Sequence, residues 1–329
     1  MAGNIAVIGG GYWGKNLVRN FAELGALHTI CDVDAKALAD FKTLYLGVDL
    51  ETDFARVLQN KDIAGVVIAT PAALHYSMAK QALQAGKDTF VEKPLALKIE
   101  EGQELVKLAE KNSKILMVGH LLEYHPAVVK LKEIINKGEL GKIQYIYSNR
   151  LNFGKIRTEE NILWSFAPHD ISVILSLLDG EMPFEICTHG GYYLHHDIAD
   201  ITLTNMSFRS GAKAHIFVSW LHPYKEQKLV VIGDREMAEF NDTSKDKLVV
   251  FKHEIEWVEK KPITHPGEPE AIKVSDDEPL KLECQEFINV IKARKKPRTD
   301  GRNGLRVLEI LSSCQRSLEA DGKVIPIGG

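Results

Sequence analysis

A short apolar run that ends in a glycine-rich turn constrains this chain more than any other feature. Residues 5–8 are Ile-Ala-Val-Ile, and the next six residues, 9–14, are Gly-Gly-Gly-Tyr-Trp-Gly before helix-like sequence follows. In a Gly-x-Gly-x-x-Gly turn, Gly9 allows a tight bend and Gly11 lets the backbone approach a pyrophosphate. Gly14 lets the following helix pack close to the strand, with its N-terminal dipole facing the phosphates. The turn therefore predicts a phosphate-binding site.

A glycine motif alone is weak evidence for dinucleotide binding, and a carboxylate at the end of the next apolar run strengthens this prediction. The run at 27–31 ends at Asp32, about 20 residues beyond the glycines, where an acid meets a ribose 2′-hydroxyl in dinucleotide-binding folds. A glycine-rich turn in an ordinary α/β domain would leave Asp32 unexplained. The same carboxylate would repel a 2′-phosphate, so the pattern favours NAD over NADP as the cofactor.

The first 120 residues alternate between strand-like and helix-like segments, which predicts βαβ units and a doubly wound parallel sheet. The expected strands are 5–8, 29–31, 65–69, 89–92 and 115–118, with helices including 14–24 and 100–111. We expect residues 1–120 to form a Rossmann NAD-binding domain.

After Gly119 the pattern changes, and residues 121–329 are expected to form an α+β substrate and oligomerisation domain with a large, mostly antiparallel open sheet. The segment 264–278, rich in Pro, Asp and Glu, is interpreted as a surface loop. The expected elements are a helix at 127–137, strands at 142–152, 200–208, 212–220, 229–232 and 248–252, and final helices at 280–293 and 303–320 that could return to the first domain.

Composition excludes several classes of partner. Of the 329 residues, 45% are hydrophobic and 26% are charged, and the net charge of -4 gives no field that attracts nucleic acid or anionic lipid. We find no signal peptide and no apolar run long enough to span a bilayer, so a cytoplasmic location is expected. The 4 cysteines are far apart and lack CxxC spacing, which is typical of reduced thiols.

A lysine before a proline is the first candidate for chemistry. Lys93 precedes Pro94 at the end of an apolar run, and the residue before a proline is held in extended geometry. The carboxyl ends of strands surround the ligand crevice in doubly wound sheets. Beside a positively charged nicotinamide, the amine of Lys93 would have a lowered pKa and could accept a proton from a substrate hydroxyl. The ordinary alternative is a solvated lysine before a turn.

Glu92-Lys93-Pro94, preceded by Thr70-Pro71-x-x-x-His75, resembles the Gfo/Idh/MocA family of NAD(P)-dependent oxidoreductases over nearly the whole chain. The resemblance implies that Lys93 contacts both nicotinamide and substrate. It also implies a cofactor site lined by Glu92, Thr70, Pro71 and His75, with further contacts from Tyr12, Trp13, His120 and Trp164.

The family also places a histidine at the start of a helix that faces the nicotinamide, and the matching residue here is His169. Pro168 suits a first helical position, so His169 is expected in the first turn, where the helix dipole keeps its ring neutral and able to accept a proton. A structural histidine is the alternative. Family members commonly have Asp four residues earlier, whereas this chain has Ser165, which cannot carry charge. Asp170 is a poor substitute, because adjacent helical residues project about 100° apart.

Three further segments, 119–126, 148–157 and 219–223, resemble the branch that oxidises nucleotide-linked amino sugars, most closely the UDP-N-acetylglucosamine 3-dehydrogenases. The resemblance implies a 3-keto sugar product for lipid A or surface polysaccharide synthesis, aminated by a partner transaminase, and a homodimer or homotetramer. Arg150 and Arg157 could hold a diphosphate or carboxylate bidentately, although surface arginines are equally expected. The implied substrate contacts are Lys93, Tyr124, Arg150, Asn152, Arg157, Ser165 and His169.

Three alternatives remain open from the sequence. They are a generic sugar or inositol dehydrogenase with the same catalytic pair, a redox-neutral glycosidase that uses bound NAD transiently, and a non-enzymatic NAD-binding sensor or scaffold. No metal is expected. His195, His196 and Asp197 could supply ligands, but neighbouring residues on a strand face opposite ways.

Overall fold

A computed structural model describes residues 4–328, and its contacts divide the chain into two compact units. The first unit contains the residues up to Tyr124 together with Asp277–Glu309, and the second contains His125–Asp276 and the residues from Ile310 onward. Among the described residues, no helix has both the length and the apolarity needed to cross a bilayer.

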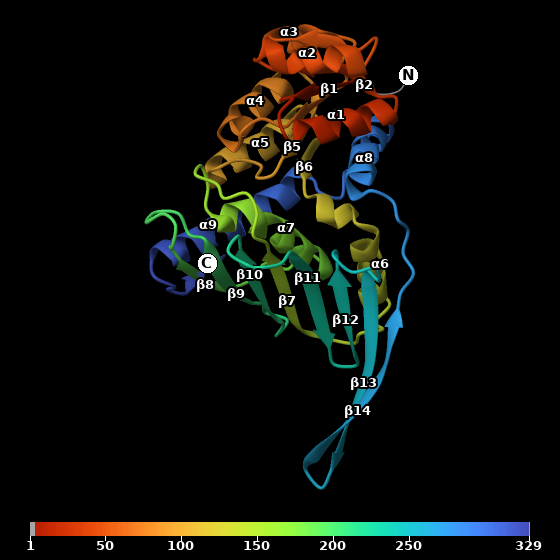
Figure 1. The fold of residues 1–329 in the computed structure, drawn as a ribbon, viewed down its shortest axis with the longest axis vertical. Helices are drawn as coiled ribbons and strands as arrows, with labels where there is room; N and C mark the ends of the chain where they lie inside the picture. Colours follow the sequence, from red (N-terminus) through yellow and green to blue (C-terminus); the bar gives the residue numbers. More distant parts are fainter. Residues whose placement is uncertain (1–3, 329) are drawn as a thin grey trace. The chain divides into compact units, whose positions relative to one another are not determined.

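The first unit is built on a parallel sheet of six strands in the order β3-β2-β1-β4-β5-β6 (Figure 1). This is the strand order of a Rossmann fold, in which the direction of winding reverses between β1 and β4. The strands are β1 (Ile5–Ile8), β2 (Leu27–Cys31), β3 (Asp49–Glu51), β4 (Gly65–Ile68), β5 (Asp88–Glu92) and β6 (Leu116–Gly119). The helices are α1 (Gly14–Glu23), α2 (Ala35–Leu44), α3 (Phe54–Gln59), α4 (Ala72–Gln84), α5 (Ile99–Lys111) and α8 (Pro279–Ala293), with a 3-10 turn η1 (Leu121–Tyr124).

The central strands consist of buried residues throughout, as expected of a parallel sheet covered on both faces. Helix α8 joins this core from the far end of the sequence. The ring of Phe287 meets Phe21 of α1 and Phe90 of β5 edge to face, with centroids 6.5 and 5.6 Å apart. The five predicted strands are confirmed to within two residues. The three-residue β3 is too short to show a pattern in the sequence.

The second unit contains a nine-stranded sheet in the order β14-β13-β12-β11-β7-β10-β9-β8-β15, in which β10 and β7 are parallel and the other neighbours antiparallel. Its strands are β7 (Ile143–Leu151), β8 (Glu185–Gly191), β9 (Ile201–Ser207), β10 (Lys213–Ser219), β11 (Glu226–Gly233), β12 (Glu236–Asn241), β13 (Leu248–Val258), β14 (Lys261–Ala271) and β15 (Ile325–Pro326). Its helices are α6 (Pro126–Asn136) and α7 (Ile162–Leu177), and the break between the units falls within α9 (Gly301–Glu319).

The two faces of this sheet differ in cover. Helices α6 and α7 pack on one face, where alternate residues such as Ile146 and Val218 are buried. Alternate residues on the other face stay half-buried or exposed, and we call this the open face. Its apolar side chains come from six strands: Leu203, Phe217, Tyr147, Ile232, Met237 and Phe251.

Two predictions about elements are wrong. Residues 264–271 belong to strand β14 instead of a loop, because a strand with an unpaired edge tolerates prolines that an interior strand would exclude. Helix α7 begins at Ile162 with Asn161 as its N-cap, so Pro168 lies inside the helix. Pro168 cannot donate the helical hydrogen bond to the carbonyl of Trp164, but it does not end the helix.

Candidate active site

The carboxyl ends of the parallel strands bring most of the predicted cofactor residues of the first unit to one edge of its sheet. The glycine loop follows β1 and Asp32 follows β2. Thr70 and Pro71 come just after β4, Lys93 directly follows β5, and His120 directly follows β6. In an open α/β sheet, this edge beside the switch point between β1 and β4 is where ligands bind.

Each glycine of the loop has a distinct steric environment. Gly9 has φ +97, and a Cβ there would lie 2.8 Å from the carbonyl oxygen of Ala69. A Cβ on Gly14 would lie 1.8 Å from the carbonyl oxygen of Gly9, so the start of α1 is packed directly on the turn. A Cβ on Gly11 would meet nothing within 4 Å. The turn and helix contact therefore require glycine, while the backbone at Gly11 is open for a pyrophosphate, as a dinucleotide site needs.

Asp32 has a structural task beside its predicted ribose contact. Its Oδ2 accepts a hydrogen bond from the backbone N–H of Gly10 at 2.7 Å, and its Oδ1 accepts one from Asp34 at 2.9 Å. The carboxylate thus holds the glycine loop against the end of β2. The sequence does not reveal this contact, since Gly10 carries no side chain that marks it.

Trp13 and Glu92 form a polar contact between the glycine loop and the end of β5. The indole Nε1 of Trp13 donates to Oε1 of Glu92 at 2.6 Å, and the backbone N–H of Lys93 donates to Oε2 at 3.2 Å. Burial raises the pKa of Glu92 to about 7, against the opposing effects of the Trp13 hydrogen bond and the charge of Lys93. Glu92 can therefore change its charge near neutral pH.

Other buried acids lie in the same unit. Glu283 of α8 is 0% exposed, and its carboxyl oxygens have no hydrogen-bond partner among the described residues. Burial first, and then the charges of Glu92 and Glu123, raise the pKa of Glu283 well above its usual value. The sequence signal for this group was an acid within the apolar stripe of a helix, at Leu280, Glu283 and Cys284.

Two histidines predicted to contact the cofactor are buried under the loops. His75 is 1% exposed, with Nδ1 2.7 Å from the carbonyl oxygen of Pro94 and Nε2 2.9 Å from that of Thr70. It ties together the loops that follow β4 and β5. His120 is also 1% exposed, and burial followed by the charge of Lys93 lowers its pKa to about 3. His120 is therefore a neutral ring at neutral pH.

In the second unit, helix α7 carries His169 and Ser165 one turn apart. Because α7 begins at Ile162, His169 lies in its third turn, and the prediction that the N-terminal dipole keeps its ring neutral is wrong. His169 is partly exposed, whereas Ser165 is buried at 3% exposure. Trp164 donates from its indole Nε1 to Oε1 of Gln315 at 3.0 Å.

Arg150 is a correction to the predicted substrate anchors. Its guanidinium is buried and makes a bidentate pair with Asp170, Nε to Oδ2 at 2.9 Å and Nη2 to Oδ1 at 3.1 Å. Ser148 donates a further hydrogen bond to the same carboxylate. The fork geometry that suggested a phosphate ligand is used inside the unit, where it holds α7 on β7.

Tyr124 is a second correction. It is 4% exposed, its hydroxyl lies 3.0 Å from Oγ1 of Thr299, and the guanidinium of Arg298 sits 5.2 Å from its ring centroid. Tyr124 therefore belongs to the core of the first unit instead of a substrate surface.

The remaining predicted substrate residues lie at or beyond the end of β7. Asn152 directly follows β7 and is half-buried, with its backbone N–H bonded to Ser219. Arg157 lies exposed in the next loop, with Nη1 3.0 Å from Oε1 of Glu160.

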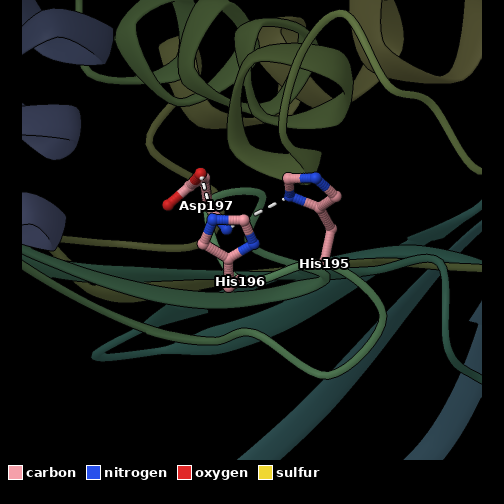
Figure 2. A group of neighbouring side chains, drawn as sticks. All are labelled: His195, His196 and Asp197. Carbon is pink, nitrogen blue, oxygen red and sulfur yellow. Dashed lines mark hydrogen bonds and ion pairs between the residues drawn. The ribbon is translucent and has the colours of Figure 1, made fainter.

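His195, His196 and Asp197 lie closer together than a strand would place them. They sit in a turn closed by a bridge between His195 and Ile198, so the expectation that they face opposite ways is wrong. Their ligand atoms lie within 4.8 Å of one another, and Nε2 of His196 is 2.7 Å from Oδ2 of Asp197 (Figure 2). All three side chains are exposed.

Comparison with known proteins identifies the family. Residues 3–120 match the model of the oxidoreductase family with an NAD-binding Rossmann fold, GFO_IDH_MocA, and residues 128–239 match the GFO/IDH/MocA C-terminal domain. The chain belongs to the Gfo/Idh/MocA family, and its first unit is an NAD-binding Rossmann domain. Dehydrogenases that act on sugar hydroxyls are among its relatives.

Two of the similar proteins have a UDP-linked amino sugar in their names or bound in their structures. UDP-N-acetylglucosamine 3-dehydrogenase from Acidithiobacillus ferrooxidans is 26% identical over 95% of this chain and 96% of its own length. Its crystal structure superposes with a TM-score of 0.85 at 24% identity, covering 97% of this chain and 98% of that one. The WlbA dehydrogenase from Bordetella pertussis, in complex with NADH and UDP-GlcNAcA, has a TM-score of 0.80 at 22% identity, covering 99% and 98%.

A third relative has a different chemistry in its name. 2,7-anhydro-N-acetylneuraminate hydratase from Mediterraneibacter gnavus is 29% identical over 62% of this chain, and the match spans 58% of that protein's length.

Proposed function

We propose that this protein is an NAD-dependent dehydrogenase that oxidises the secondary hydroxyl at ring carbon 3 of a nucleotide-linked amino sugar, such as UDP-N-acetylglucosamine. The observation that carries the proposal is Lys93 at the carboxyl end of β5, beside the buried Glu92 and on the same sheet edge as the glycine loop. The full-length similarity to a UDP-N-acetylglucosamine 3-dehydrogenase supports this substrate class.

Lys93 and His169 are assigned the removal of the hydroxyl proton. A lysine amine near a cationic ring has a lowered pKa, and a neutral imidazole can receive a proton. When bound, NAD supplies the nicotinamide that takes the hydride from the sugar carbon. The protein contributes orientation and charge around that transfer.

The carboxyl group of Glu92 is the neighbouring charge that acts on the amine of Lys93. Glu92 accepts hydrogen bonds from Trp13 and from the backbone of Lys93, and it changes charge near pH 7. A negative Glu92 favours the protonated amine of Lys93, and a neutral Glu92 favours the free amine. The pair therefore provides a means of setting how readily Lys93 accepts a proton.

Substrate contacts are proposed for Arg157, Asn152 and Ser165. The exposed guanidinium of Arg157 can exchange Glu160 for a diphosphate, since both offer paired oxygens to the same fork. Asn152 offers amide groups suited to sugar hydroxyls. Ser165 lies one helical turn before His169, at the position where the family resemblance implies a carboxylate, and its hydroxyl is buried, so only a rearrangement of α7 would bring it to the sugar.

We also propose a homodimer or homotetramer assembled through the open face, since large exposed apolar patches mark interaction surfaces. A transaminase that aminates the 3-keto sugar is the proposed next enzyme, because the ketone at ring carbon 3 is a group that transaminases convert to an amine. Lipid A or surface polysaccharide synthesis is the corresponding use.

The test incubates purified protein with NAD and UDP-N-acetylglucosamine and follows both reduced nicotinamide and the keto sugar. We expect both to form in equal amounts, because each hydroxyl oxidised transfers one hydride. The measurement follows a single turnover, because a cofactor that stays bound would not accumulate as free NADH. The same assay is run with anhydro-sugars and glycosides as substrates. Product formed there without any reduced nicotinamide would instead identify a redox-neutral reaction. The similarity to a hydratase makes this reaction the main alternative. Bound NAD with no turnover of any sugar would identify a sensor.

A further inference from the structure

A cavity lies at one edge of the parallel sheet in the first unit, at the end opposite the cofactor residues. Its volume is about 490 Å³, within the range of roughly 300–1,000 Å³ that is usual for small-molecule sites. Its lining residues come from 106–116, 294–297 and 300–302, all within the first unit. Lys114 and Ile115 come just before β6, whereas His120 follows the other end of that strand. Because β5 and β6 are parallel, the cavity is at the edge where they begin, and Lys93 is at the edge where they end.

The lining of this cavity is strongly basic. It contains five basic side chains and two acidic ones, which are Lys114, Arg294, Lys295, Lys296 and Arg302 against Glu110 and Asp300. The whole chain, in contrast, has a net charge of -4. Cations of one sign gathered in a concave surface focus the electric field and raise the local concentration of anions. The cavity is therefore suited to a ligand with several negative charges.

Three of these cations already have partners inside the unit. The shortest N–O distances are 2.6 Å for Arg294–Asp88, 2.7 Å for Lys296–Asp300 and 2.6 Å for Arg302–Glu110. Among residues 4–328, Lys114 and Lys295 form no ion pair with a carboxylate. Two ammonium groups therefore remain available to a ligand, and each guanidinium has more N–H donors than its carboxylate uses.

The surplus positive charge acts on a buried neighbour. Lys87 is 7% exposed, and its ammonium donates to the carbonyl oxygen of Ile63 at 2.8 Å. Burial first, and then the charge of Lys114, lower the pKa of Lys87. The region around Lys114 is therefore electropositive, and an anion placed there would reduce the repulsion between the two lysines.

Cations near the ends of helices have an ordinary role, because they complement the negative C-terminal dipole. This role fits Lys295 and Lys296, which follow α8, and Lys114, which follows α5. It does not fit Arg302, which lies in the first turn of α9, at the positive end of that helix. Each helix end carries about half an elementary charge, so the two C-terminal ends offset about one of the three surplus positive charges of the lining.

Apolar residues form another part of the lining. Val106, Ala109, Ile115 and Leu116 are each at most 8% exposed, and Pro297 is also buried. These groups offer contact to a ring or another apolar body, but nothing that an inorganic anion would use. The lining as a whole therefore fits a molecule that joins an apolar body to a multiply charged group.

We propose that this cavity is a second ligand site, which binds a small molecule that carries a phosphate chain on a planar apolar body, as nucleoside triphosphates do. Phosphate oxygens match the ammonium and guanidinium donors, and the apolar residues match the body. The inference is independent of the proposed reaction, because the site is at the other edge of the sheet from Lys93. A nucleic acid is a poor fit, because the chain as a whole has a negative net charge.

Calorimetric titration of ATP into the full chain tests the site, in magnesium-free buffer with NAD at saturation so that the Rossmann site is occupied. We expect one ATP to bind per chain. Lys114→Gln with Lys295→Gln removes the two unpaired charges, and we expect the dissociation constant for ATP to rise at least about tenfold. Lys107→Gln with Lys292→Gln is the matched control, because both lysines are exposed on α5 and α8 but do not line the cavity. We expect the control to change binding less than about threefold, since salt screens charges that do not touch the ligand.

Two further measurements separate the parts of the site. Glu110→Gln should tighten ATP binding, because it removes one of the two lining carboxylates and releases the guanidinium of Arg302. Tripolyphosphate has the phosphate chain without the apolar body, and we expect it to bind at least about tenfold more weakly than ATP.

Four results would overturn the second site. They are no ATP binding to the NAD-saturated wild type, equal losses in the two double variants, binding in Glu110→Gln no tighter than in the wild type, or tripolyphosphate that binds as tightly as ATP. Sugar oxidation is measured separately, so an inactive protein that binds ATP in the expected way rejects the proposed reaction and keeps the second site.

Discussion

The indole of Trp13 donates a 2.6 Å hydrogen bond to the carboxyl group of Glu92, joining the glycine loop after β1 to the last residue of β5. Glu92 is so closely packed that a Cβ on Gly119 would lie 2.7 Å from its Oε2. The position of the glycine loop and the charge of Glu92, the residue before Lys93, therefore depend on each other through this hydrogen bond.

Trp13→Phe should raise the pKa of Glu92 above about 7, because it removes a donor that stabilises the charged carboxylate. A hydrogen bond to a charged group contributes about 1.5–3 kcal/mol, so the acid dissociation constant of Glu92 should fall at least about tenfold. Carbon NMR titration of labelled glutamate carboxyls measures it, with Glu92→Gln identifying the signal. An unchanged titration midpoint would mean that the bond does not act on the charge of Glu92.

Asp32→Ala should weaken NAD binding and reduce the preference for NAD over NADP. The carboxylate holds the loop through Gly10 and would repel a 2′-phosphate, so its loss removes both effects. We expect wild-type protein to bind NAD at least about tenfold more tightly than NADP, a difference of ~1.4 kcal/mol. Calorimetric titration of both cofactors checks this, and equal affinities in the wild type would contradict it.

Arg150→Ala should destabilise the protein strongly, because it leaves the carboxylate of Asp170 buried without its guanidinium. Removing one partner of such a pair costs about 3–5 kcal/mol of unfolding free energy. Arg157→Ala is the control, since an exposed pair contributes about 0–1 kcal/mol. Urea unfolding measures both, and we expect the KM for the nucleotide sugar to rise in Arg157→Ala. Similar stabilities of the two variants would contradict this assignment.

Glu283→Gln should stabilise the protein at high pH and have little effect at low pH. Because its folded pKa lies well above 4.5, Glu283 contributes most to stability below that pH, and the contribution is lost as pH rises through the folded pKa. Glutamine mimics the neutral form and removes this loss. Thermal unfolding at pH 5 and pH 9 measures the difference, with Glu286→Gln as control. A variant that melts below the wild type at pH 9 would contradict the account.

Much of the first unit follows from its sequence, since apolar strands, glycines and Asp32 are local signals with fixed spacing. The role of Gly10 as a donor to Asp32 and of His75 as a tie between two carbonyls could not be predicted, because both depend on contacts between separate loops. The same holds for Phe287, which reaches the first unit's core from the end of the chain.

The errors in the second unit have physical causes. Pro168 suggested a helix start, but the preceding turn is stabilised by the Asn161 cap and by buried Ile162 and Leu163. Arg150 was interpreted as a phosphate ligand because its partner, Asp170, is 20 residues away and reaches it only through packing of α7 on β7. Sequence alone cannot distinguish a guanidinium that binds a ligand from one that binds a distant carboxylate.

The most direct test of the central claim is a single-turnover measurement of nicotinamide reduction with UDP-N-acetylglucosamine, comparing wild type with Lys93→Ala. We expect rapid reduction in the wild type, and a rate at least about 100-fold lower in the variant with NAD affinity nearly unchanged, because the variant lacks a general base. Equal rates in the two proteins, or no reduction of bound NAD by any nucleotide sugar in the wild type, would contradict it.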